Sequence, residues 1–87
     1  DQRTATLAAI ARVADQIRRD DPDLTKVMRG ISGSSKDSVR LQLTKGRTVT
    51  WGSTTQPQRK LEVLDTLLGI SASEYDVSAP DQPTTRG

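Results

Sequence analysis

The chain has 87 residues, of which 32% are hydrophobic and 28% are charged, and it contains neither cysteine nor histidine. The absence of these two residue types excludes disulfide bonds, thiol nucleophiles and the commonest metal ligands and general bases. Thirteen basic and eleven acidic residues give a net charge of +2 and are interleaved along the chain, as on an ordinary solvated surface. The apolar content is well below the usual ~45–50%, which predicts one small domain with a thin core.

The chain begins with Asp1, and its only methionine is Met28. Because a translated chain starts with methionine, we expect this sequence to be a piece of a longer protein. It holds no run of ~20 apolar residues, the length that a membrane-spanning helix needs.

Residues 4–19 are predicted to form an amphipathic helix with Thr4 as its N-cap. The predicted solvent side carries Arg12, Asp15, Gln16 and Arg19, and the predicted apolar stripe carries Leu7, Ile10, Ala11, Ala14 and Ile17. Residues 20–23, Asp-Asp-Pro-Asp, should end this helix, because the residue before a proline avoids the α region. The acidic residues here are favoured as a helix-ending turn, since their spacing does not match a calcium loop.

Three strands are predicted next. Residues 24–32 form the first if a bulge near Arg29 and Gly30 reconciles their apolar pattern. Residues 38–44 alternate cleanly and predict a half-buried strand, with an inner face of Val39, Leu41 and Leu43. Residues 47–52 form its hairpin partner through a two-residue turn, Lys45-Gly46.

Trp51, the only tryptophan, has two interpretations. Beside Val49 on the inward face of its strand, it is favoured as a core residue, although tryptophan is also enriched at binding hot spots.

A second helix should follow, with a capping box formed by Thr55 and Gln58 and with Pro57 in its first turn. Its apolar stripe is Leu61, Leu64, Leu67 and Leu68.

The chain should end in a short strand. Tyr75 and Val77 alternate with acidic and hydroxyl residues, and Pro80 and Pro83 stop any regular strand beyond Ala79. The predicted fold is α+β: a small, mostly antiparallel sheet of a three-strand meander plus a C-terminal strand, covered on one face by two helices. Residues 1–80 form this domain, and residues 81–87 are predicted to be a flexible tail.

The residues point away from enzymatic chemistry. No glycine-rich phosphate loop, metal-ligand set or nucleophile–base pair is visible, so we expect no catalytic residue, no cofactor and no metal. The sequence pI of about 9.4, with Arg40, Lys45 and Arg47 around the hairpin, leaves a small basic nucleic-acid-binding module as an alternative. Interleaved charges and scarce aromatic residues weigh against it.

Two segments carry a family resemblance: K-G-R-T-V-T-W-G-S at residues 45–53 and Y-D-V-S-A-P-D-Q-P-T at residues 75–84, separated by a leucine-rich helix. Together they resemble the end of the FtsQ/DivIB family of bacterial cell-division proteins. The resemblance implies a parent with one membrane span, a POTRA domain and a C-terminal β-domain outside the membrane, at the division septum. This chain would be most of that β-domain.

The resemblance also implies a function. Family members act as scaffolds that hold the partners FtsB (or DivIC) and FtsL, and FtsB adds a strand to the last strand of the β-domain. Carried over by position, the partner-binding residues are Tyr75, Asp76, Val77, Ser78 and Ala79. An edge strand has unpaired N–H and C=O groups, which allow such docking or self-association through the same edge.

Overall fold

The computed structural model describes residues 1–87 as an α+β fold built on one five-stranded sheet. Its elements are α1 (Gln2–Asp20), α2 (Pro22–Thr25), β1 (Met28–Gly33), β2 (Val39–Leu43), the 3₁₀ turn η1 (Thr44–Gly46), β3 (Thr48–Gly52), α3 (Pro57–Leu67), β4 (Glu74–Asp76) and β5 (Thr84–Arg86).

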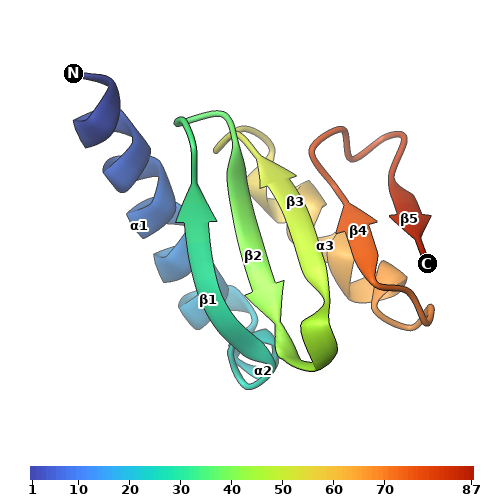
Figure 1. Cartoon of the computed structure of the whole chain (residues 1–87). Helices are drawn as coiled ribbons and strands as arrows, with labels where there is room; N and C mark the ends of the chain where they lie inside the picture. The colour runs from blue at the N-terminus through green and yellow to red at the C-terminus, as the bar shows by residue number, and fades with distance from the viewer.

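The strands lie in the order β1-β2-β3-β4-β5, as Figure 1 shows. The first three form the predicted antiparallel meander. The chain then crosses behind the sheet through α3 and returns as β4, which runs parallel to β3. Finally β5 pairs with β4 in the antiparallel direction.

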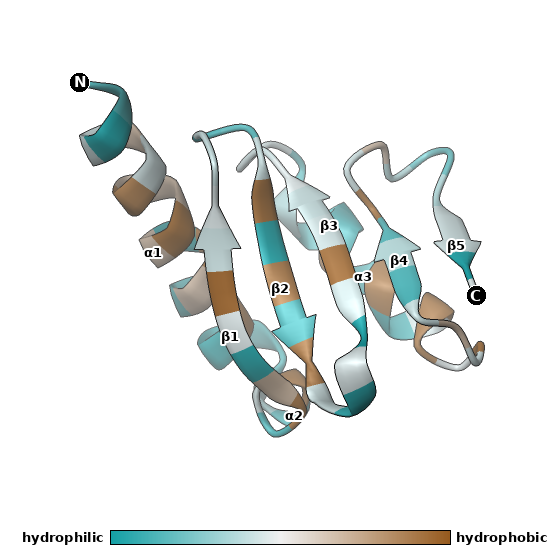
Figure 2. Ribbon diagram, in the orientation of Figure 1, coloured by the Kyte–Doolittle hydropathy of each residue, from teal (hydrophilic) through white to brown (hydrophobic).

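The helices lie behind the sheet in Figure 1, and the opposite face is left open. Along β2 and β3 hydrophobic and hydrophilic residues alternate (Figure 2), so that Val39, Leu41 and Leu43 face the helices. The core prediction is confirmed for Val49, Trp51, Leu61 and Leu64, which are all buried, and Leu68 packs half-buried against them.

The hairpin and the bulge follow the predicted chemistry. Lys45 and Gly46 both have positive φ, 65° and 71°, a conformation that glycine adopts without strain. The register between β1 and β2 shifts between Met28 and Gly30, which confirms the expected bulge around Arg29.

Helix α1 is rotated relative to the predicted stripe. Ile17 is buried as expected, but Leu7 is 61% exposed and Gln16 is only 6% exposed. The side chains that enter the core are Ala9, Val13, Gln16 and Ile17. The N-cap is Asp1, whose Oδ1 accepts a hydrogen bond from the Thr4 N–H at 2.9 Å, so Thr4 is not the cap.

Residues 22–25 form the short helix α2 where a strand was predicted to begin. Asp21 Oδ1 accepts a hydrogen bond from the Leu24 N–H at 3.3 Å, and Leu24 is buried. Because proline suits the first position of a helix, Pro22 both ends α1 and begins α2.

The predicted capping box before α3 is wrong. The N-cap is Gln56, which has φ 49° and makes no side-chain capping bond. The Thr55 hydroxyl pairs instead with the Ser53 hydroxyl at 2.7 Å. The prediction of a flexible tail over residues 81–87 is also wrong for residues 84–86, which form β5.

Candidate functional site

The predicted docking segment, residues 75–79, begins in β4. This strand pairs with β3 on one side and with β5 on the other, from Glu74 opposite Arg86 to Asp76 opposite Thr84. The expectation that β4 is an open edge is therefore wrong, and the outer strand on this side of the sheet is β5.

Two of the five predicted contact residues lie in the core. Tyr75 is 2% exposed, and its hydroxyl donates to the Ile70 carbonyl at 2.6 Å. Val77 is fully buried, and its N–H donates to the Thr50 carbonyl at 3.0 Å. Their side chains therefore hold β4 in the fold and are closed to a partner in this conformation.

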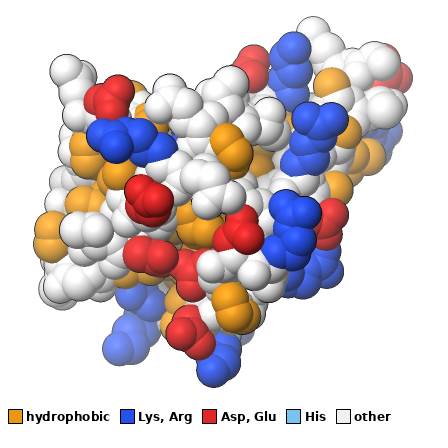
Figure 3. Space-filling model, turned by 180° about the vertical axis from the view of Figure 1, so that it is seen from behind, with side chains coloured by type: hydrophobic (Ala, Val, Ile, Leu, Met, Phe, Trp, Pro, Cys, Tyr) orange, Lys and Arg blue, Asp and Glu red, His pale blue; other side chains and the backbone are white.

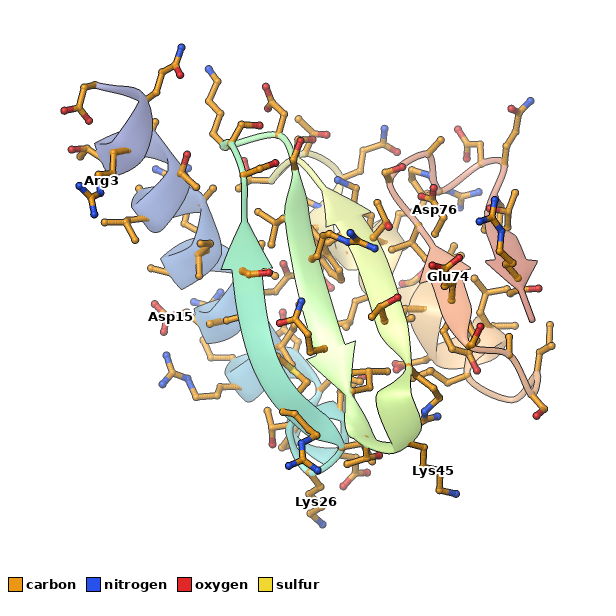
Figure 4. All side chains as sticks on the ribbon, in the orientation of Figure 1. Arg3, Asp15, Lys26, Lys45, Glu74 and Asp76 are labelled. Atoms are coloured by element: carbon orange, nitrogen blue, oxygen red, sulfur yellow. The ribbon has the colours of Figure 1, made fainter.

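The other three are more accessible. Asp76 is half-buried, and Ser78 and Ala79 are exposed. Asp76 Oδ1 accepts from the Ser78 N–H at 2.9 Å and from the Ser78 hydroxyl at 2.6 Å, which fixes the chain as it leaves β4. In Figure 4 Glu74 and Asp76 lie on the face of the sheet that the helices leave open.

Strand β5 is held almost entirely by polar contacts. All three of its residues are exposed. The Arg86 carbonyl accepts from the Ser73 N–H at 2.9 Å and from the Ser73 hydroxyl at 3.1 Å. An exposed ion pair joins Arg86 to Glu74 at 3.6 Å, and such pairs contribute little.

The direction of the peptide groups in β5 follows from the ladder beside it. Thr48 N–H donates to the Ser73 carbonyl, and Val77 N–H donates to the Thr50 carbonyl, so the groups of the intervening Tyr75 face β3. Because the peptide groups of successive residues in a strand point to opposite sides, the N–H and C=O groups of Glu74 and Asp76 face β5. Thr85, opposite Tyr75, then directs its own N–H and C=O away from the sheet.

The loop between β4 and β5 is tied to the helix layer. Pro80 is buried, and the Gln82 N–H donates to the Ala79 carbonyl at 2.9 Å. Asp81 accepts from the Arg59 side chain in α3 at 2.8 Å. These contacts position β5 even though it contributes no residue to the core.

Lys60 of α3 lies fully buried beneath the end of β3. Its Nζ donates to the Ser53 carbonyl at 2.7 Å and lies 5.9 Å from the centre of the Trp51 ring. Burial lowers the pKa of this amine below its ordinary value of 10.5, because the charged form loses its hydration. The contact joins α3 to the loop that leaves β3.

A carboxyl pair links α3 to the junction of α1 and α2. Partial desolvation, together with a hydrogen bond and the charge of Asp21, raises the pKa of Asp65 from 3.8 to about 7. The carboxylates of the acidic turn at residues 20–23 have partners within the chain: Asp20 accepts a hydrogen bond from Gln58, and Asp23 pairs with Lys26. No group of three or more possible ligands is arranged to hold a metal ion.

Sequence reasoning missed β5. The available signal was Thr84-Thr85, a β-branched pair after Pro83, which favours a strand only weakly.

No helix of the chain combines the length and the apolarity that crossing a bilayer requires.

Comparison with known proteins gives one consistent result. The chain is 42% identical over 65 residues to a cell division protein FtsQ of Mycobacteroides abscessus, covering 75% of this chain and 21% of that protein. It is 36% identical over 83 residues to the FtsQ of Streptomyces bingchenggensis, covering 93% of this chain and 29% of that protein. The FtsQ of Streptomyces venezuelae is 42% identical over 67 residues, covering 75% and 25%.

No family model and no solved structure matches the chain. The curated relatives are much longer than the chain, which spans between a fifth and three tenths of the proteins just named. The matched residues nevertheless include most of the fold described above. On this similarity the chain belongs to the FtsQ family of bacterial cell-division proteins.

Proposed function

We propose that this chain is the partner-binding part of an FtsQ-type scaffold, with no catalytic activity, and that it holds an FtsB-type or FtsL-type division protein by strand addition at its C-terminal edge. The observation that carries the proposal is the outer side of β5, where the peptide groups of Thr85 point away from the sheet. An unpaired strand edge is a ready template for a second chain.

The proposed docking edge belongs to β5, which is held in place by the rest of the sheet. β5 lies against β4, and β4 is fixed by the buried Tyr75 and Val77. Residues 75–77 thus support the docking strand, and the exposed Ser78 and Ala79 follow β4 in the loop that leads to β5. Direct contact between these two residues and a partner is part of the proposal.

The available ladder is short. Alternation along β5 leaves Thr85 as the one residue of the strand whose N–H and C=O both face outward, and Pro83, two residues earlier, has no N–H to give. Few main-chain bonds mean a modest affinity for the isolated chain, on the order of micromolar. Confinement of both proteins to one membrane would raise the effective affinity.

The parent protein would be anchored in the cell membrane by one span, with this domain on the extracytoplasmic side at the division septum. The family membership and the resemblance of residues 45–53 and 75–84 to the end of FtsQ/DivIB proteins support this location. In that setting, strand addition would recruit the partner to the site of septum assembly.

The test is a pair of substitutions at one residue. Thr85→Pro removes the outward N–H and leaves the bonds between β4 and β5 intact, whereas the matched Thr85→Ala keeps that N–H. We expect Thr85→Pro to weaken binding at least ten-fold and Thr85→Ala less than three-fold. Calorimetry with the extracytoplasmic segments of the FtsB-type and FtsL-type proteins from the same genome measures this.

Two results would contradict the proposal. Equal affinity for Thr85→Pro and the unmodified chain would show that the edge of β5 is not used. No binding of either partner by the unmodified chain would exclude the partner class. An amide NMR spectrum that stays unchanged outside β5 confirms that the variant is folded.

A further inference from the structure

A cavity of about 360 Å³ lies between α1 and the start of α3. Helix α1 contributes Arg12, Gln16 and Arg19 to it, and Thr54, Pro57 and Gln58 come from the loop and first turn of α3. Spacings of four and seven residues place the three α1 side chains on one face. Seen from behind in Figure 3, basic side chains gather along the α1 side of the molecule.

Gln16 is an unexplained buried group at this cavity. Its side chain was predicted to face solvent, but only 6% of the residue is exposed. Its Nε2 has no acceptor anywhere in the chain. A buried amide donor without a partner loses its hydration without compensation, so an acceptor supplied by a ligand would remove this cost.

The start of α3 adds further free donors. Gln56 provides no side-chain cap, and the first helical bond runs from the Lys60 N–H to the Gln56 carbonyl. The N–H groups of Gln58 and Arg59 therefore have no acceptor within the chain. The positive end of an eleven-residue helix meets the cavity at this point, and such helix ends favour anions.

Two guanidinium groups complete the set. Arg12 and Arg19 make no ion pair, and Arg12 also lines an adjoining cavity of about 290 Å³ with Lys36. One carboxylate, that of Asp15, also lines the cavity, but it pairs with Arg18, and the nearby Asp20 accepts from the side chain of Gln58. The cavity thus brings together two arginines without an ion pair and three N–H donors without an acceptor, and its one carboxylate is already paired.

We infer that this cavity binds a phosphate group. Two guanidinium groups and a helix N-terminus supply donors suited to the several acceptor oxygens of phosphate, and Gln16 would direct its Nε2–H toward the same oxygens. Phosphate can be presented as the free ion or within a larger phosphodiester such as a phospholipid headgroup, and both carry the recognised chemistry.

The test follows backbone amides by NMR during a titration of the whole chain with inorganic phosphate. Chloride at matched ionic strength is the salt control. We expect phosphate to shift the Gln58 and Arg59 amides and the Gln16 side-chain amide with half-saturation on the order of 1 mM. The double variant Arg12→Gln/Arg19→Gln should bind about ten-fold more weakly.

Matched variants make the result specific. Arg3→Gln/Arg29→Gln removes the same charge away from the cavity and should bind phosphate as the unmodified chain does. Equal shifts with chloride, or unchanged affinity in the Arg12→Gln/Arg19→Gln variant, would overturn the inference. Vesicles of phosphatidylglycerol at the same phosphate concentration then identify the source of the phosphate group. Vesicle binding that is abolished in the Arg12→Gln/Arg19→Gln variant supports a lipid headgroup. Binding of inorganic phosphate without binding of vesicles supports a small molecule.

Discussion

Gly52 ends β3 at a position where a side chain has no room. Its φ is +88°, and a Cβ added there would lie 2.8 Å from the Cβ of Ser78 and 3.3 Å from its Cα. Gly46 has a similar φ of +71°, but nothing lies within 4 Å of its added Cβ. The two glycines therefore separate backbone strain from steric conflict.

Gly46→Ala should lower the free energy of unfolding by about 1–2 kcal/mol, the cost of a left-handed conformation with a Cβ. Gly52→Ala carries the same strain and must also displace Ser78, which adds about 1–3 kcal/mol. The expected total for Gly52→Ala is about 2–5 kcal/mol. A small domain with roughly 5–15 kcal/mol of stability would feel this loss strongly.

Urea denaturation followed by tryptophan fluorescence measures both variants, since Trp51 is the single tryptophan and is fully buried. Ser78→Gly in the Gly52→Ala background removes the closest clashing atom and should restore about 1 kcal/mol or more relative to the sum of the single changes. If Gly52→Ala costs no more than Gly46→Ala, the close packing of β3 against the segment after β4 is refuted.

Two further predictions concern the polar groups of Asp65 and Tyr75. Because the pKa of Asp65 is raised from 3.8 to about 7, the folded state holds a proton that the unfolded state releases between those values, so stability should fall as pH rises from about 4 to 7. Asp65→Asn should flatten that pH dependence in urea denaturation at several pH values, and an unchanged slope would contradict the assignment. Tyr75→Phe removes the 2.6 Å bond to the Ile70 carbonyl and should cost about 1 kcal/mol; a loss near zero in the same assay would show that water replaces the hydroxyl.

The central hairpin could be predicted because its signals are local. Val39, Leu41 and Leu43 alternate strictly, and the turn contains a glycine, so periodicity fixes both the strand and its buried face. Trp51 falls on the inward parity of the partner strand. These features depend on short spacings that a sequence displays directly.

The parts that could not be predicted depend on context. Strand β5 buries no apolar side chain. Its pairing depends on main-chain hydrogen bonds, which leave no pattern of apolar residues in the sequence. The rotation of α1 that buries Gln16 is decided by how the helix packs on the sheet. The expected capping box failed because Thr55 pairs with the Ser53 hydroxyl, a contact that competes with the cap.

The position of β5 also changes what the edge can do. A long, flat, apolar edge strand would invite pairing with any exposed strand. β5 has three exposed residues, ends in a charged arginine and follows a proline, and the opposite edge, β1, is interrupted by a bulge. Each edge is therefore a poor template for chance association. If the chain binds a partner as proposed, that partner would have to supply its strand at high local concentration, a condition that anchoring two proteins in one membrane would create.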